Sequence, residues 1–322
     1  MRLLLILSLT FVLAACQSAT DPALPGGGTP PDSASSSTVQ TDADAYQAVA
    51  DSALASLGPD VDPSQIVSLG GPITETVYAL GMGENVIGAD QSSLYPEGVL
   101  EKPRLNYFRQ TSAEGVLSLA PTLVLASDET GPPEVLDQIR SAGTPVLAIP
   151  SPETIAEAEA RIALIGRVLG REAEADSLSD RMRRQLAEAE SLRPEEAPRA
   201  LFIYARGAGL VQVLGTGTTA DLVLRLAGAE NAAGIEGNAP LTAEAVAAAQ
   251  PDVVVIPARG LESIGGVEGL FAQPGLAQTP AGASQRVVAV DDALLLGLGP
   301  RVGEGVIELA RGLSASPVAE AQ

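Results

Sequence analysis

The chain repeats one order of segments, a short apolar run, a glycine turn and a helical stretch, and this repetition constrains the fold more than any other feature. The first copy starts at Ile66–Leu69 and the second at Val211–Leu214. A constant offset of 146 residues relates the matching positions, which are Glu75 and Asp221, Glu84-Asn85 and Glu230-Asn231, and Gly88 and Gly234. The offset predicts two lobes of related structure.

A second match between the halves indicates the class of fold. Ala113–Leu125 and Ala243–Val255 each consist of a helical segment, a proline and a continuous run of apolar residues. Runs of Val, Leu and Ile that alternate with helices are typical of parallel sheets covered on both faces. We therefore expect an α/β fold with two related lobes, mainly parallel sheets and a ligand cleft between the lobes.

A long helical segment predicts how the lobes are joined. Leu178, Met182 and Leu186 share one face of a helix expected from about Glu172 to Ser191. A helix of about 20 residues spans about 30 Å, which is enough to reach from one lobe to the other. The predicted boundaries are 64–170 for the N-terminal lobe, 171–193 for the linking helix, 194–315 for the C-terminal lobe and 316–322 for a tail.

The N-terminus has the pattern of an export signal. Arg2 precedes the apolar run Leu3–Val12, and small residues lead to Cys16, the one cysteine of the chain. This pattern predicts a lipoprotein signal peptide over 1–15 and a lipidated Cys16, so that the protein is anchored to a membrane and faces the periplasm or the cell exterior. Residues 16–63 are rich in Ser, Thr, Pro and Gly, which predicts a flexible tether.

The composition restricts the partners and the ligand chemistry. The formal net charge of −21 argues against binding to nucleic-acid phosphates. The chain has no histidine, so the commonest ligand of zinc, copper and haem iron is missing. If a transition metal or haem is bound, tyrosine is the remaining ligand type. Tyr46 falls in the predicted tether and Tyr78 on the apolar side of a helix, which leaves Tyr95, Tyr107 and Tyr204.

Tyr107 and Arg109 form the most suggestive pair among these candidates. In an extended segment residues i and i+2 point the same way, so the phenol and the guanidinium would face one cleft together. A nearby guanidinium favours the phenolate, which can ligate ferric iron. Taken alone, the pair is better explained as an ordinary tyrosine at a strand end beside a solvated arginine, and the rest of the chain is what favours a ligand site.

The second lobe offers further candidates. Tyr204 and Arg206 end its first apolar run, and a guanidinium there could bind a carboxylate or lie on the surface of a glycine-rich loop. Arg104, Arg259 and Arg301 are weaker candidates of the same type. Gly215–Ala220 matches a dinucleotide-binding pattern, but the first copy of the repeat lacks the spacing, so this pattern carries little weight.

With these residues, the stretch from about Gln65 to Leu313 resembles the haem-transport substrate-binding proteins of bacterial ABC importers. These are periplasmic binding proteins with two lobes and a rigid linking helix. The matching stretches are Gly70–Gly81, Tyr107–Gln110 with Ser112–Ser118, Gly217–Gly228, Pro240–Glu244 and Asp291–Pro300.

The resemblance implies roles for individual residues. Tyr107 would ligate ferric haem and Arg109 would hydrogen-bond its phenolate. Glu75 and Asp221 would pair with basic residues of a permease. From their places in the chain, and not from the resemblance, Tyr95, Tyr204 and Arg206 are candidate cleft or propionate contacts. The expected function is capture of ferric haem and its delivery to the permease and ATPase complex of an ABC transporter, without catalysis. The alternatives are a ferric siderophore or cobalamin receptor of the same fold and, more remotely, an exported nucleotide-dependent oxidoreductase.

Overall fold

The computed structural model describes residues 35–58 and 61–315 of the chain, with side chains from residue 44 onward. Both lobes belong to one compact unit, which begins at Gln40. The predicted signal peptide, Cys16 and the tail at 316–322 lie outside the described residues. Among the helices of the described part, none is both long enough and apolar enough to cross a membrane.

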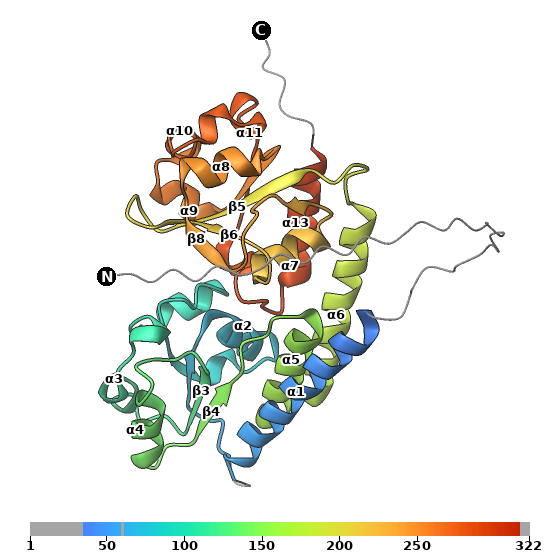
Figure 1. The fold of residues 1–322 in the computed structure, drawn as a ribbon. Helices are drawn as coiled ribbons and strands as arrows, with labels where there is room; N and C mark the ends of the chain where they lie inside the picture. The colour runs from blue at the N-terminus through green and yellow to red at the C-terminus, as the bar shows by residue number, and fades with distance from the viewer. Residues whose placement is uncertain (1–34, 59–60, 316–322) are drawn as a thin grey trace, which may run out of the picture. The chain divides into compact units, whose positions relative to one another are not determined.

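The N-terminal lobe contains a four-stranded parallel sheet (Figure 1). Its strands are almost completely buried, because helices cover the sheet and the strand sequences are continuous apolar runs. In spatial order they are β2 (Val86–Ala89), β1 (Ile66–Leu69), β3 (Leu123–Ser127) and β4 (Val146–Ile149). The helices are α2 (Gly71–Ala79), α3 (Ala113–Leu117), α4 (Val135–Ser141) and α5 (Ile155–Leu169), with short 3₁₀ turns η1 (Gly83–Asn85), η2 (Glu97–Glu101) and η3 (Phe108–Gln110).

The C-terminal lobe has a mixed sheet in which the parallel strands are β10 (Val287–Val290), β9 (Val253–Pro257), β5 (Arg199–Ala205) and the two-residue β7 (Glu230–Asn231). The strands β6 (Val211–Leu214) and β8 (Asn238–Pro240) are antiparallel to their neighbours. The helices are α7 (Thr219–Leu226), α8 (Ala243–Ala249), α9 (Ala258–Ser263), α10 (Gly266–Phe271), α11 (Pro280–Ala283), α12 (Asp292–Leu295) and α13 (Val302–Ser314), and η4 spans Leu276–Gln278.

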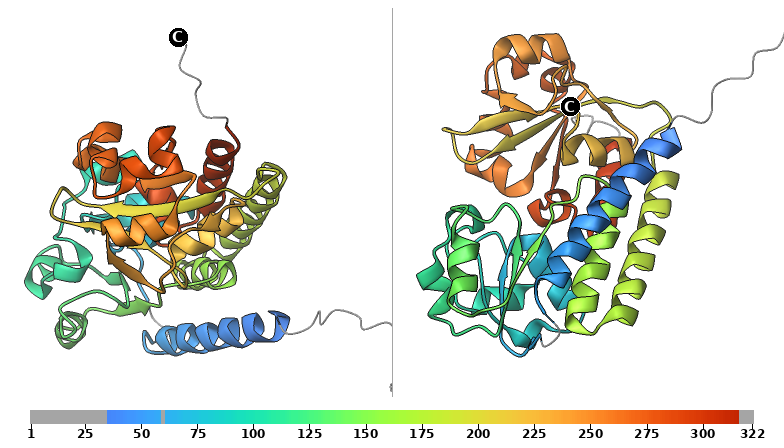
Figure 2. Two further views of the ribbon diagram at one scale, coloured as in Figure 1. Left: turned by 45° about the horizontal axis from the view of Figure 1, so that its top comes forward. Right: turned by 60° about the horizontal axis from the view of Figure 1, so that its bottom comes forward.

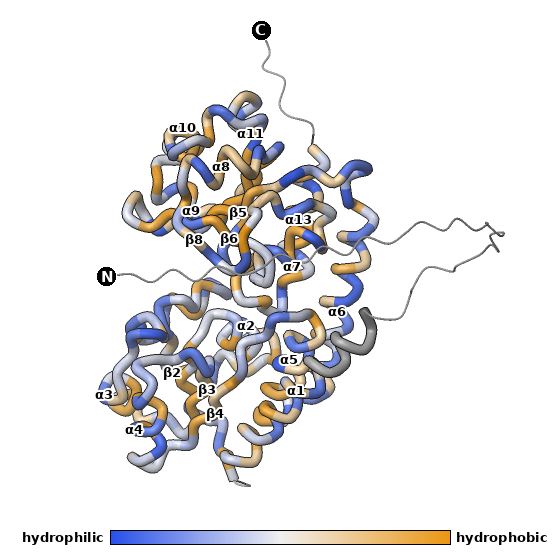
Figure 3. Tube along the Cα trace, viewed as in Figure 1, coloured by the Kyte–Doolittle hydropathy of each residue, from blue (hydrophilic) through white to orange (hydrophobic). Residues whose placement is uncertain are grey.

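The expected α/β class with two lobes is confirmed, but the repeat is less regular than the sequence suggests. β1 is a parallel strand, whereas its sequence counterpart β6 runs antiparallel to β5. The reason is the short turn between β5 and β6, since a connection of this length can only join antiparallel strands. In Figure 3 the strands of the N-terminal sheet are largely orange, as expected for buried apolar runs.

The helix α6 spans Glu172–Ser191, the range assigned above to the linking helix. It packs against α5 of the N-terminal lobe and against α13 of the C-terminal lobe. The two views of Figure 2 show α13 beside α6. Because one continuous helix contacts both lobes, it restricts how far they can move apart.

A helix stands where the sequence analysis expected part of a flexible tether. α1 spans Ser35–Ala55, and within it Tyr46 and Ala50 are buried in the main hydrophobic core. The Tyr46 hydroxyl donates to the carbonyl of Pro150 at 2.8 Å, and Asp51 pairs with Arg167 at 3.0 Å. The composition of this stretch concealed its helical spacing, since Tyr46, Ala50, Ala53, Leu54 and Leu57 fall on one face.

Candidate functional site

The Tyr107 segment is a single 3₁₀ turn, so the expectation of an extended segment is wrong in detail. Tyr107 precedes η3, and Phe108 is buried in the core of the N-terminal lobe. The Phe108 amide donates to Oδ2 of the fully buried Asp90 at 3.2 Å. This anchor holds the turn in place, while Tyr107 stays half-buried and Arg109 exposed.

Glu129, which was not among the residues predicted from the sequence, forms an ion pair with Arg109. Two backbone hydrogen bonds join the segments that carry them: the Gly131 amide donates to the Phe108 carbonyl at 3.1 Å, and the Thr111 amide to the Gly131 carbonyl at 2.9 Å. Glu129 follows the carboxyl end of β3. Since ligands of α/β sheets bind beyond the carboxyl ends of strands, this position was a usable signal.

The C-terminal lobe presents a second Tyr-x-Arg pair at the end of β5. The Arg206 Nε donates to the Tyr204 hydroxyl at 2.7 Å, and the guanidinium carbon lies 5.6 Å from the centre of the tyrosine ring. Arg206 is exposed and Tyr204 partly buried. Both lobes therefore carry a phenol with a cation two residues further along the chain.

The two pairs interact electrostatically across the lobes. Burial raises the pKa of Tyr107 above its ordinary value because it disfavours the phenolate, and Arg109 acts in the opposite direction. Tyr204 and Arg206 also act on this pKa, the first raising it and the second lowering it. We call Tyr107, Arg109, Tyr204 and Arg206 the interlobe quartet. Within it, two phenols and two cations lie near enough for the charges of one lobe to act on the groups of the other.

Glu75 does not lie at a surface where a permease could reach it. Its side chain is 4% exposed and accepts from Arg301 Nη2 at 2.9 Å and from Nε at 3.2 Å. Burial raises the pKa of Glu75 to about 7, against the opposing effect of Arg301. The role inferred from the resemblance is therefore corrected, because this carboxylate is already paired inside the protein.

Tyr95 lies at the same junction between the lobes. The Arg301 guanidinium carbon is 3.4 Å from the centre of the Tyr95 ring, a close cation–π contact. Nearby, Arg161 is 4% exposed and donates to the carbonyls of Gly297, at 3.1 Å, and Leu298. Tyr95 thus contacts Arg301 at this junction, while the residue stays 44% exposed.

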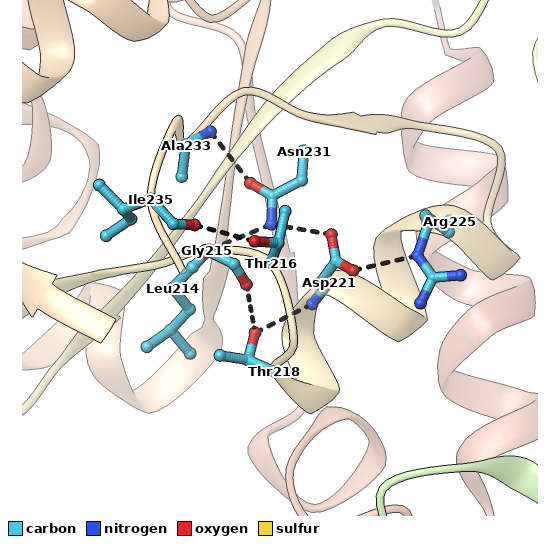
Figure 4. Close-up of polar contacts among 9 residues, drawn as sticks. All are labelled: Leu214, Gly215, Thr216, Thr218, Asp221, Arg225, Asn231, Ala233 and Ile235. Atoms are coloured by element: carbon cyan, nitrogen blue, oxygen red, sulfur yellow. Dashed lines mark hydrogen bonds and ion pairs between the residues drawn. The ribbon is translucent and has the colours of Figure 1, made fainter. Parts of the chain in front are cut away.

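Asp221 is also directed inward (Figure 4). It accepts from Arg225 Nε at 3.0 Å and from Asn231 Nδ2 at 3.2 Å, and its side chain is 9% exposed. The first bond lies within α7, and the second ties α7 to β7. The docking role inferred for Asp221 is corrected for the same reason as that of Glu75.

The Gly215–Ala220 loop is packed against the chain rather than open to a phosphate (Figure 4). The Gly215 and Thr216 amides donate to the carbonyls of Gly237 and Ile235, at 2.7 and 2.9 Å. A Cβ at position 215 would lie 2.1 Å from the Ile235 oxygen, so glycine is required by packing. The geometry gives the dinucleotide interpretation no support.

The comparison with family models decides the family. The model described as periplasmic binding protein matches residues 66–294. The chain belongs to the periplasmic binding protein family.

Three relatives illustrate the range of this family around the chain. It is similar to the solved periplasmic heme-binding protein RhuT from Roseiflexus sp. RS-1, in apo form, with 44% identity and a TM-score of 0.75, over 78% of this chain and 98% of RhuT. It is 30% identical to the uncharacterized ABC transporter substrate-binding lipoprotein YvrC of Bacillus subtilis, over 78% of this chain and 80% of YvrC. A cobalamin-binding protein of Halobacterium salinarum is 27% identical over 78% and 69%.

The two lobes can also be compared at a matching pair of helices. The helices α3 and α8 are the second pair of repeat segments, and each is capped by a hydroxyl side chain, Ser112 or Thr242. Glu114 and Glu244 follow at equivalent positions in their first turns, and both are exposed.

Proposed function

We propose that this protein captures one ferric haem between its lobes, with Tyr107 as the iron ligand and Arg109 as its support, and delivers it to an ABC transporter. The interlobe quartet is the observation that carries the proposal. A phenolate is a hard anionic donor suited to Fe(III). The 44% identity to a solved haem-binding protein supports haem as the ligand.

The arginines of the quartet suit the rest of the ligand. Haem carries two propionates, and a guanidinium can bind a carboxylate through two parallel hydrogen bonds. Arg206 is exposed at the end of β5 and could release Tyr204 to bind a propionate. Tyr95, beside Arg301, is a contact at the edge of the site. The protein binds and releases its cargo and catalyses no reaction.

Delivery requires an exported body that meets a permease. A lipid on Cys16 would keep the protein at the membrane, in line with the lipoprotein YvrC. We assign permease docking to Glu114 and Glu244, one per lobe, in place of the buried Glu75 and Asp221. They would pair with basic residues of the permease.

The docking assignment is tested with charge reversals. Glu114→Lys and Glu244→Lys together should abolish co-purification with the cognate permease and ATPase while leaving haem binding unchanged. Glu84→Lys, also on the surface, is the matched control. Retained co-purification in the double variant would remove these two acids from the interface.

Cobalamin is the second candidate ligand, because a cobalamin-binding protein matches most of the chain. Cobalamin or a ferric siderophore needs no protein ligand on its metal. Titrations of the purified protein with ferric haem, cyanocobalamin and a ferric siderophore separate the candidates. We expect saturable binding of haem alone, whereas saturation by cobalamin or the siderophore without haem binding would overturn the proposal.

A further inference from the structure

We propose that Glu129 draws the Arg109 guanidinium away from the ligating phenol and thereby speeds the release of haem. The inference rests on the proposed function, since it concerns the same site. It assigns Glu129 a role as a positioning residue that acts through Arg109.

The backbone fixes Glu129 next to Arg109. The segment after β3 is joined to η3 by the two backbone hydrogen bonds of Gly131, and the Glu129 amide donates to the Ser127 hydroxyl at 3.2 Å. Glu129 contacts Arg109 through Oε2 and Nη2. The backbone hydrogen bonds between these two segments therefore bring the side chains of Glu129 and Arg109 together.

Arg109 has two anionic acceptors available once Tyr107 is deprotonated. Its guanidinium interacts with Glu129 by hydrogen bonding and charge, and with Tyr107 and Tyr204 by charge. A carboxylate on the guanidinium offsets much of the positive charge that would stabilise a phenolate. Glu129 also adds a negative charge near a cargo that carries two propionates.

Glu129 has two effects, a contribution to stability through its ion pair and a weakening of haem binding, and the exposure of the pair shows which effect is larger. The side chains of Arg109 and Glu129 are 52% and 46% exposed, so their ion pair adds little to the stability of the fold and Arg109 is free to change partner. Repulsion of the anionic haem propionates and competition with the phenolate for Arg109 both weaken haem binding. The net effect is weaker binding of haem, which suits a protein that must release its ligand to a transporter.

The experiment measures the rate of haem loss from the purified holo protein to an excess of apomyoglobin at fixed pH. Glu129→Gln keeps the shape and one acceptor but removes the charge, and we expect release slowed by about threefold or more. Glu134→Gln removes another exposed carboxylate near the start of α4, outside the Arg109 ion pair, and should stay close to wild type.

An Arg109→Ala background separates this mechanism from a general charge effect. If Glu129 acts through Arg109, the slowing caused by Glu129→Gln should largely disappear there, and the visible spectrum of Glu129→Gln should shift in the tyrosinate charge-transfer region only when Arg109 is present. Unchanged or faster release in Glu129→Gln would overturn the inference, as would the same slowing without Arg109. Absence of haem binding in wild type would instead overturn the proposed function.

Discussion

Two arginine–carboxylate pairs in this protein share their chemistry and differ in burial. At the lobe junction, Arg301 and Glu75 have side chains that are 17% and 4% exposed. At the quartet, Arg109 and Glu129 are 52% and 46% exposed. A buried pair cannot lose one partner without leaving a charge in a low-dielectric environment, whereas an exposed pair can exchange partners at little cost. The first pair therefore maintains the structure and the second is free to respond to a ligand.

The largest effect is expected from breaking the buried pair. Arg301→Ala leaves Glu75 buried without its cation and also removes the contact with Tyr95. We expect a loss of about 3–5 kcal/mol in the free energy of unfolding, measured by urea denaturation.

Glu75→Gln in the same assay is the informative companion, because a neutral amide is less costly to bury than an unpaired carboxylate. It should lose less stability than Arg301→Ala. A loss below about 1 kcal/mol for Arg301→Ala would show that this pair stabilises the protein no more than an exposed pair does.

The exposed pair should show the reverse pattern. Arg109→Ala removes a charge-assisted hydrogen bond to the phenolate, which is worth about 1.5–3 kcal/mol, so haem affinity should fall by about tenfold or more. The free energy of unfolding should change by less than about 1 kcal/mol. Competition titration with ferric haem and urea denaturation measure the two quantities. Unchanged affinity would show that Arg109 does not contribute to haem binding.

The smallest effect concerns α1. Tyr46→Phe removes the hydrogen bond to the Pro150 carbonyl but keeps the buried ring, and should cost about 1 kcal/mol of stability. Tyr95→Phe, which keeps its ring on Arg301, is the control and should change stability less. No loss for Tyr46→Phe would indicate that α1 does not dock on the lobe in solution.

The sequence predicted those parts of the fold in which local pattern and tertiary structure agree. Continuous apolar runs became the parallel strands, and the apolar face of 172–191 became α6. The prediction failed where the buried face of a helix consists largely of small residues, as in α1, whose alanines gave no clear apolar pattern. It also misjudged β6, because the turn after Arg206 sets the strand direction and periodicity does not record it.

The candidate site was predicted in part. Tyr107, Arg109, Tyr204 and Arg206 were all named from the sequence, and the charges of the other three act on the pKa of Tyr107. Their role in binding a ligand stays a prediction. Glu75 and Asp221 were misjudged because an acid in the first turns of a helix looks the same whether it faces solvent or a buried arginine. Glu129 was missed because its partner is 20 residues away in the chain.

The visible absorption spectrum of the purified protein with ferric haem, recorded for wild type, Tyr107→Phe and Tyr204→Phe, tests the central claim most directly. We expect a high-spin tyrosinate spectrum in wild type and in Tyr204→Phe, and its loss in Tyr107→Phe with an affinity at least about 100-fold lower. An identical spectrum and affinity in Tyr107→Phe would contradict the assignment of Tyr107 as the iron ligand.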